Sequence, residues 1–139
     1  MIFATTFLTN AYSAGSTDSG SDKTKSNYDK AVTLIKLAKK YEKKGKEVKA
    51  TKNYEKAQKL LIKSNNQTPN KADTLNYLGF TTRKLGDYEK GEKYYLQGLD
   101  LEPNHNGINE YLGELYVITN RFDLARERLK KQIKVMKKL

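Results

Sequence analysis

The sequence predicts an all-α, superhelical protein with about three helix-turn-helix repeats and six main helices. Apolar residues recur at three- and four-residue steps from Ser26 onward, which is helical spacing. Small residues recur 34 positions apart, and Pro69 and Pro103 stand where helical pairs would end. No segment shows a convincing strand pattern, and 139 residues are enough for one folded domain.

The composition argues against an enzyme. The chain has no Cys and only one His, His105, so a thiolate or histidine metal site and most nucleophile-base pairs lack a required part. There is also no glycine-rich phosphate loop. We therefore expect no catalysis, no cofactor and no metal, and we expect His105 to be an ordinary surface residue.

Residues 1–25 read as a leader that resembles a signal peptide, followed by a flexible linker. A short apolar stretch from Ile2 to Leu8 precedes small residues ending near Ala14, and a Ser/Gly/Asp run follows. No Lys or Arg precedes the apolar stretch. We expect an exported protein, periplasmic or secreted; the alternative is a disordered tail on a cytoplasmic protein. No stretch approaches the roughly 20 apolar residues of a membrane span.

The first helical pair is predicted within residues 26–64. One amphipathic helix begins at Ser26 and continues past Tyr41, and a second runs from about Lys52 to Ser64. Between them, the segment 47–53 is expected to lengthen the turn by seven residues.

Shifting the sequence by 34 aligns residues of like size. Gly79 falls on Gly113, Gly91 on Ala125, and Tyr88 on both Tyr54 and Phe122. Small residues allow close approach of helices, so a bulky residue at Gly79 or Gly113 should force them apart.

Other repeated positions define the turns and the core. The aromatic residues of the 34-residue shift are expected to fill the turns, and Gly45, Gly86 and Asn120 to end the first helices in a left-handed conformation. The predicted packing positions are Leu37, Ala38, Tyr54, Ala57, Leu78, Gly79, Tyr88, Gly91, Tyr95, Pro103, Leu112, Gly113, Phe122 and Ala125.

The segment from Leu75 to Pro103 resembles one full tetratricopeptide repeat. By this resemblance the domain spans 26–139, with repeats at about 31–71, 72–105 and 106–139, as in a small bacterial member of the family. The resemblance implies a right-handed superhelix that serves as a scaffold and takes a protein or peptide segment in its concave groove.

The same resemblance implies which residues face the groove. The first helix of each repeat lines it, which gives Lys39, Glu42, Asp73, Asn76, Phe80, Arg83, Glu110, Glu114 and Val117. Members that grip a C-terminal carboxylate carry Lys, Arg or Asn at positions that here hold Ile35, Tyr77, Gly107 and Tyr111. We therefore expect no such clamp.

A second hypothesis is electrostatic binding to nucleic acid or to an anionic membrane surface. Residues 23–63 carry 14 lysines and four acidic residues. The patch would comprise Lys36, Lys40, Lys43, Lys44, Lys49, Lys52, Lys56, Lys59 and Lys63. A solvated basic face is the competing interpretation. The last helix is uncapped, so pairing with a second copy of the chain is a further possibility.

Overall fold

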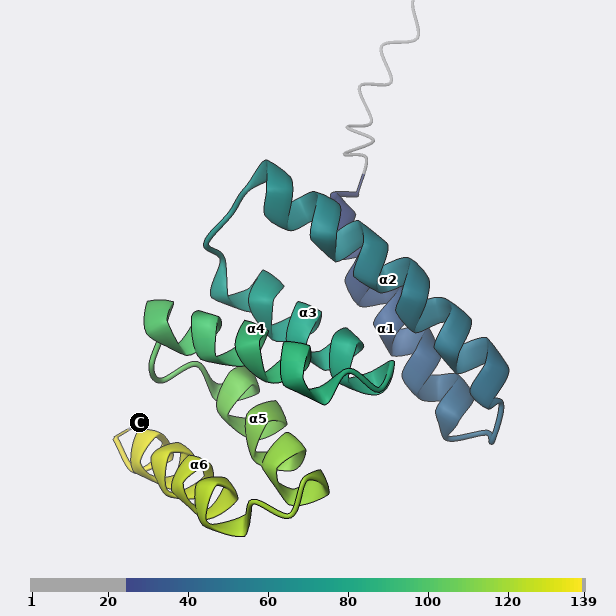
Figure 1. Cartoon of the computed structure of the whole chain (residues 1–139). Helices are drawn as coiled ribbons and strands as arrows, with labels where there is room; N and C mark the ends of the chain where they lie inside the picture. The colour runs from purple at the N-terminus through teal and green to yellow at the C-terminus, as the bar shows by residue number, and fades with distance from the viewer. Residues whose placement is uncertain (1–24, 139) are drawn as a thin grey trace, which may run out of the picture.

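The computed structural model describes residues 25–138 as a stack of helices without a strand. The helices are α1 (Asn27–Glu42), α2 (Glu47–Gln67), α3 (Ala72–Lys84), α4 (Tyr88–Leu101), α5 (Asn106–Ile118) and α6 (Phe122–Met136). They form three consecutive antiparallel pairs, and α2 and α4 lie in front of α1 and α3 in Figure 1. The predicted all-α fold is confirmed. The leader lies outside the described residues.

The first helix begins at a reciprocal cap. The Asp29 N–H donates to Ser26 Oγ at 3.1 Å, and the Ser26 N–H donates to Asp29 Oδ2 at 3.2 Å. These two bonds satisfy amide groups that have no partner within the helix, and they set the start of α1 at Asn27.

The three first helices end in the same way, as the sequence predicts. Gly45, Gly86 and Asn120 have φ values of 65°, 95° and 58°, in the left-handed region. The residue after each donates its N–H back into the helix, for example from Asp87 to the Thr82 carbonyl at 3.1 Å. The common turn brings each second helix back along its partner.

The additional seven residues of the first repeat do not lengthen its turn, which corrects the prediction. Instead α2 has 21 residues where α4 has 14, and α2 continues past the stack at its C-terminal end. Two pairs of buried residues lie 41 positions apart in the sequence: Ala50 with Gly91, and Tyr54 with Tyr95. The structural counterpart of Tyr54 is therefore Tyr95, not Tyr88, because a helix can grow at its far end without disturbing the turn.

Two of the three aromatic residues expected to fill the turns are exposed instead. Tyr88 and Phe122 are the first residues of their helices and are 41% and 56% exposed. Tyr54 is buried because its ring packs edge-on against Phe80 at 5.7 Å and its hydroxyl donates to Glu42 Oε2 at 2.9 Å. No comparable aromatic contact is found for the other two among residues 25–138.

Leu37 and Pro103 also differ from the packing prediction. Leu37 is 38% exposed, whereas Leu78, at the matching position of α3, is buried. The difference follows from position in the stack, since no described helix precedes α1. Pro103 is exposed in the connection between α4 and α5 and limits the helix rather than packing in the core.

Small residues produce close contact in the second repeat but not in the third. A Cβ atom added at Gly79 would lie 2.5 Å from the Tyr95 ring, and one added at Gly91 would lie 3.1 Å from the Gly79 carbonyl oxygen. At Gly113 the nearest atom would be Arg128 Cβ at 3.6 Å, an ordinary contact. A single added carbon therefore meets no steric conflict at Gly113, unlike at Gly79, because α5 and α6 pack less closely there.

The apolar core forms two clusters that meet at α3. One joins α1, α2 and α3 around Tyr54 and Leu78; the other joins α3, α4 and α5 around Tyr95 and Leu112. Ala38 and Ala57 are fully buried in the first cluster, and Ala125 is half-buried beside the second. No helix in the described part of the chain is long and apolar enough to cross a membrane.

Candidate functional site

Side chains from α1, α3 and α5 surround a hollow of about 260 Å³ on the face lined by the first helices. Five of the predicted groove residues line it: Lys39, Glu42, Phe80, Arg83 and Glu114. Lys43, Lys84 and Tyr111 complete it and were not among the residues predicted to bind a partner in the groove. We call this set the groove hollow. Its residues are as many as 75 positions apart in sequence, so only the stacking of the repeats brings them together.

The floor of the groove hollow is aromatic and carries an ammonium group. The rings of Phe80 and Tyr111 lie 4.8 Å apart between centroids. Lys39 Nζ lies 4.5 Å from the Phe80 centroid and 5.1 Å from the Tyr111 centroid, and it donates to the Tyr111 hydroxyl at 2.9 Å. Cation–π attraction therefore holds this ammonium over a surface that is largely shielded from water.

Cations outnumber carboxylates around the groove hollow. Arg83 Nη2 donates to Glu114 Oε2 at 2.7 Å, and Lys84 pairs with Glu42. Within residues 25–138, no ion pair engages Lys39 or Lys43. The hollow thus presents two positive charges that no carboxylate of the described chain neutralises.

The neutral Tyr54 hydroxyl contacts Glu42, one of the two carboxylates of the groove hollow. Burial raises its pKa strongly, and the hydrogen bond to Glu42 adds to the increase. The hydroxyl therefore stays protonated at neutral pH and donates to the carboxylate. This bond orients Glu42 toward Lys84 and leaves Lys39 without a carboxylate partner.

The other predicted groove residues lie elsewhere. Glu110 and Val117, together with Glu114, line a separate apolar hollow of about 420 Å³ between α5 and α6. The Asp73 carboxylate oxygen Oδ1 lies 2.9 Å from His105 Nε2.

Asn76 is buried against α5, and its Oδ1 has no hydrogen-bond partner among the described residues. Asn76 is therefore not available to a partner, which corrects its assignment; helix periodicity alone does not distinguish a groove-facing position from one covered by the next repeat.

His105 is a structural cap and not an ordinary surface residue. Its Nδ1 accepts from the Ile108 N–H at 3.1 Å and closes the N-terminus of α5. The remaining ring nitrogen faces Asp73, so the neutral ring with hydrogen on Nε2 satisfies both contacts. A Ser, Thr, Asn or Asp at this position would have signalled a cap in the sequence, whereas histidine does not.

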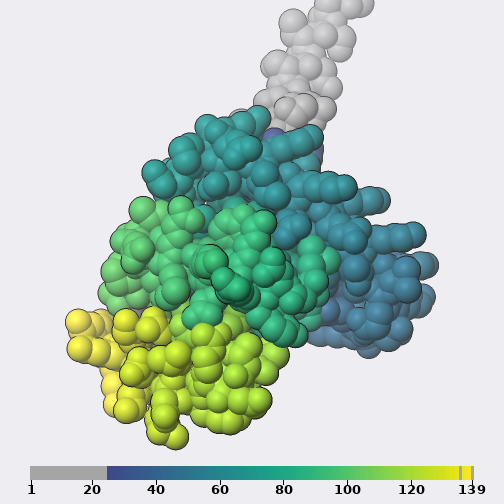
Figure 2. Space-filling view, viewed as in Figure 1, coloured from purple at the N-terminus to yellow at the C-terminus, as the bar shows by residue number. Residues whose placement is uncertain are grey.

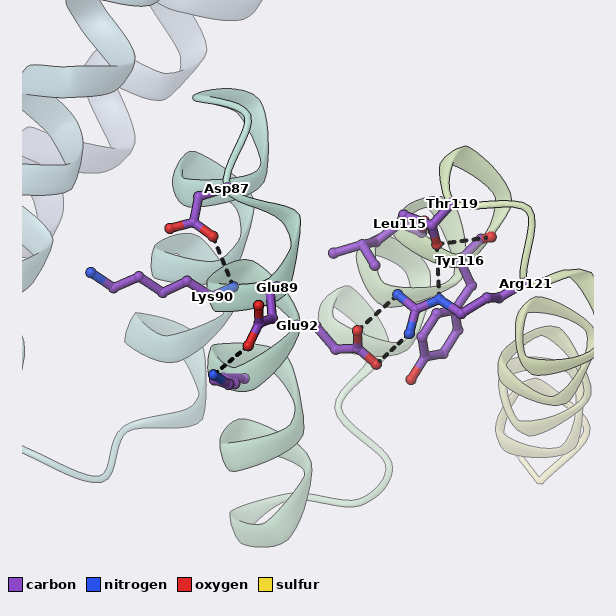
Figure 3. A network of polar contacts seen from close by, with 9 residues as sticks. Asp87, Glu89, Lys90, Glu92, Leu115, Tyr116, Thr119 and Arg121 are labelled. Carbon is purple, nitrogen blue, oxygen red and sulfur yellow. Dashed lines mark hydrogen bonds and ion pairs between the residues drawn. The ribbon is translucent and has the colours of Figure 1, made fainter.

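A polar cluster fastens the third repeat to the second (Figure 3). Arg121, in the turn between α5 and α6, places Nη1 3.0 Å from Glu92 Oε1 and Nη2 2.8 Å from Glu92 Oε2. Its guanidinium lies 4.6 Å from the Tyr116 centroid, and Nε donates to Thr119 Oγ1 at 2.9 Å. The two-point contact fixes the direction in which α5 and α6 leave α4, and with it the shape of the groove.

The described residues contain no group of three His, Cys, Asp or Glu side chains close enough to hold a metal ion. In the groove hollow both carboxylates are in ion pairs, Glu114 with Arg83 and Glu42 with Lys84, and the ammonium groups of Lys39 and Lys43 are in none. This arrangement is suited to binding and does not include a paired nucleophile and base.

Comparison with known proteins agrees with the helical pairs. A tetratricopeptide repeat model matches residues 72–105. The chain is similar to the sol locus transcriptional repressor of Clostridium acetobutylicum, with 40% identity over 60 residues. These residues are 43% of this chain and 19% of the repressor, so the chain matches about a fifth of that relative's length.

Solved structures show the same fold at low sequence identity. A MamA double mutant (RS-1 ArsTM) has a TM-score of 0.55 and 21% identity, over 77% of this chain and 56% of that one. The second tetratricopeptide domain of Spaghetti, bound to the HSP90 peptide SRMEEVD, has a TM-score of 0.53 and 17% identity, over 76% and 91% of the two chains. MamA (AMB-1) has a TM-score of 0.54 and 19% identity, over 77% and 73%.

The repeat match, the helical pairs with their common turn and the structural neighbours agree with one another. Residues 72–105 of the chain form a tetratricopeptide repeat, and the described residues share the fold of tetratricopeptide repeat structures.

Proposed function

We propose that the chain is a non-catalytic scaffold that binds a segment of another protein in the groove hollow. The observation that carries this proposal is the pair of uncompensated ammonium groups, Lys39 and Lys43, beside an aromatic floor. A segment that carries a carboxylate would neutralise the two ammonium groups, and an apolar side chain of that segment would pack against the partly buried ring of Tyr111. Binding by burial in a preformed groove requires no covalent step.

The rigidity of the floor supports this role. Phe80 is 3% exposed, and Arg83 is held by Glu114 and lies 5.6 Å from the Phe80 centroid. A binding surface whose side chains are already fixed loses little conformational entropy when a partner arrives. The groove hollow therefore offers specificity at low entropic cost.

The peptide complex of the Spaghetti domain suggests a segment as the ligand but not its mode of binding. That domain is described as binding SRMEEVD, a peptide with three carboxylate side chains. In this chain Ile35 is buried and Gly107 has no side chain, so two of the clamp positions provide no cation. We therefore propose an internal acidic segment over Lys39 and Lys43, not a gripped C-terminal carboxylate.

The test compares two variants of equal charge change in pull-downs from native extract. In the groove variant Lys39→Gln and Lys43→Glu remove the free cations; in the control variant Lys90→Glu and Lys93→Gln change two lysines of α4. A protein retained by the parent and the control, but lost by the groove variant, supports the proposal. Equal retention by both variants contradicts it, provided that their thermal unfolding matches the parent's.

Export also remains a proposal, because residues 1–25 include the leader that would carry the signal. The mass and N-terminal residue of the native protein test it. A chain that begins near Gly15 supports export, and an intact Met1 in protein from the cytoplasmic fraction contradicts it.

A further inference from the structure

A regular stripe of lysines follows the outer face of α2. The five side chains are exposed and alternate at steps of three and four residues: Lys49, Lys52, Lys56, Lys59 and Lys63. This spacing keeps them on one side of the helix. The buried residues Ala50, Tyr54, Ala57 and Leu61 lie on the opposite side. At 1.5 Å per residue the stripe is about 21 Å long. We call it the α2 lysine stripe.

The charge of the α2 lysine stripe is only partly balanced by the described chain, through Glu55 at helical spacing from Lys52 and Lys59 and through the Tyr41 ring 5.8 Å from Lys49 Nζ. No ion pair among residues 25–138 engages any of its five lysines, and the only acidic residues of α2 are Glu47 and Glu55. Like charges three and four positions apart on a helix repel and destabilise it. An external layer of negative charge would relieve this repulsion.

The shape of the surface favours a plane as the partner. The stripe lies on a single straight helix that forms the outer edge of the first repeat, and the side chains of α2 project there in Figure 2. Its last two turns extend beyond the length of α4, so among the described residues the second repeat does not obstruct that end. Within residues 25–138, all five lysines of the stripe are exposed.

We propose that the α2 lysine stripe binds the surface of a membrane that contains anionic lipids. Five ammonium groups on one line match a layer of lipid phosphates and carboxylates by charge alone. Val48, which is 71% exposed, and Ile62, which is 40% exposed, flank the stripe four turns apart. Their apolar side chains can enter the headgroup layer beside the lysines.

The same residues fit nucleic acid less well. The stripe contains no arginine, the residue that makes paired hydrogen bonds to phosphate and guanine. It also lacks an exposed aromatic side chain on which bases would stack. Lysines act as point charges, and point charges suit a fluid lipid surface.

The experiment measures co-sedimentation of the full chain with lipid vesicles. One set contains phosphatidylcholine and phosphatidylserine, and the other phosphatidylcholine alone. The stripe variant changes the five lysines to glutamine, and the matched variant changes five lysines of the last helix and its end to glutamine: Lys130, Lys131, Lys134, Lys137 and Lys138. Both variants have a net charge of +6 instead of +11, so total charge is controlled.

We expect the parent and the matched variant to bind phosphatidylserine vesicles and the stripe variant to lose about 3,000-fold in affinity, at roughly fivefold for each of the five lysines. High salt should abolish binding of the parent to the vesicles, because the Debye screening length falls from about 10 Å at 0.1 M to about 3 Å at 1 M ionic strength.

Three results would overturn the proposal. They are no parent binding at low ionic strength, equal loss in both variants, and stripe-dependent retention on DNA without vesicle binding. The Lys39→Gln/Lys43→Glu variant keeps the stripe and should still bind vesicles, so the membrane proposal and the groove proposal fail independently.

Discussion

Replacing Gly79 by alanine tests how closely the second repeat is packed. The added Cβ would lie 2.5, 2.6 and 2.9 Å from Cε1, Cδ1 and Cζ of Tyr95, a ring that is fully buried and cannot swing into solvent. Overpacking of this kind costs about 1–3 kcal/mol. Alanine is favoured over glycine inside a helix by about 0.8–1.0 kcal/mol. The net loss of unfolding free energy is therefore about 0–2 kcal/mol.

Gly113→Ala is the matched control, since it makes the same substitution in the middle of another first helix. Its nearest contact would be at 3.6 Å, so we expect only the helical gain of about 0.8–1.0 kcal/mol. The difference between the two variants isolates the steric cost of about 1–3 kcal/mol. In a domain of this size that difference corresponds to roughly 3–18 °C in Tm.

The assay is urea and thermal unfolding followed by circular dichroism. A second substitution, Tyr95→Leu, removes the ring atoms that the new Cβ would meet. In that background Gly79→Ala should become neutral or stabilising, as Gly113→Ala is in the parent. If Gly79→Ala and Gly113→Ala melt together in the parent background, the packing described between α3 and α4 is wrong.

The remaining predictions concern the caps, the tyrosines and the junction between repeats. His105→Ala should lower the unfolding free energy by about 0.5–2 kcal/mol because α5 loses its cap, while His105→Asn, which keeps an acceptor, should lose less; urea unfolding separates them. Burial raises the pKa of Tyr28 from 10.0 in the unfolded chain to about 12, so unfolding releases a proton between these pH values and stability should fall as pH rises through this window. Tyr28→Phe should reduce that fall, and an unchanged pH profile would contradict the assignment. A double-mutant cycle of Arg121→Ala and Glu92→Ala should give a coupling of about 0.5–1 kcal/mol, and additive losses would show that the contact in Figure 3 does not stabilise the junction.

The sequence was sufficient to predict the architecture because local signals and repetition agree. Gly45, Gly86 and Asn120 mark the ends of the first helices, and each adopts the left-handed conformation that such an end requires. The repeat boundary at 72–105 likewise coincides with the residues matched by the family model.

Register in the first repeat could not be obtained from the 34-residue shift. The 34-residue shift aligns Tyr54 with Tyr88, which is exposed. The buried tyrosine of α4 that corresponds to Tyr54 is Tyr95, 41 residues further along the chain. Seven additional residues in α2 are compatible with either a longer turn or a longer helix. Only the contacts across the pair decide between them.

The candidate site was partly predictable. Lys39, Phe80 and Arg83 follow from assigning the first helices to the concave face. Tyr111, which forms half of the aromatic floor, is 72 residues from the lysine that it binds, and their contact depends on the angle between repeats. Asn76 lies on a first helix too, yet the next repeat covers it. Burial of this kind depends on neighbours in space, which helix periodicity does not contain.

A photocrosslinking amino acid placed in the living cell tests the central claim most directly. It is introduced at Lys43, on the rim of the groove hollow, and in a separate strain at Lys93, an exposed lysine of α4. We predict that the probe at Lys43 captures a protein through a segment containing Asp or Glu, identified by mass spectrometry, and that the probe at Lys93 does not. Capture of the same protein with equal yield from both positions, or of none from Lys43, would contradict a groove that binds a partner.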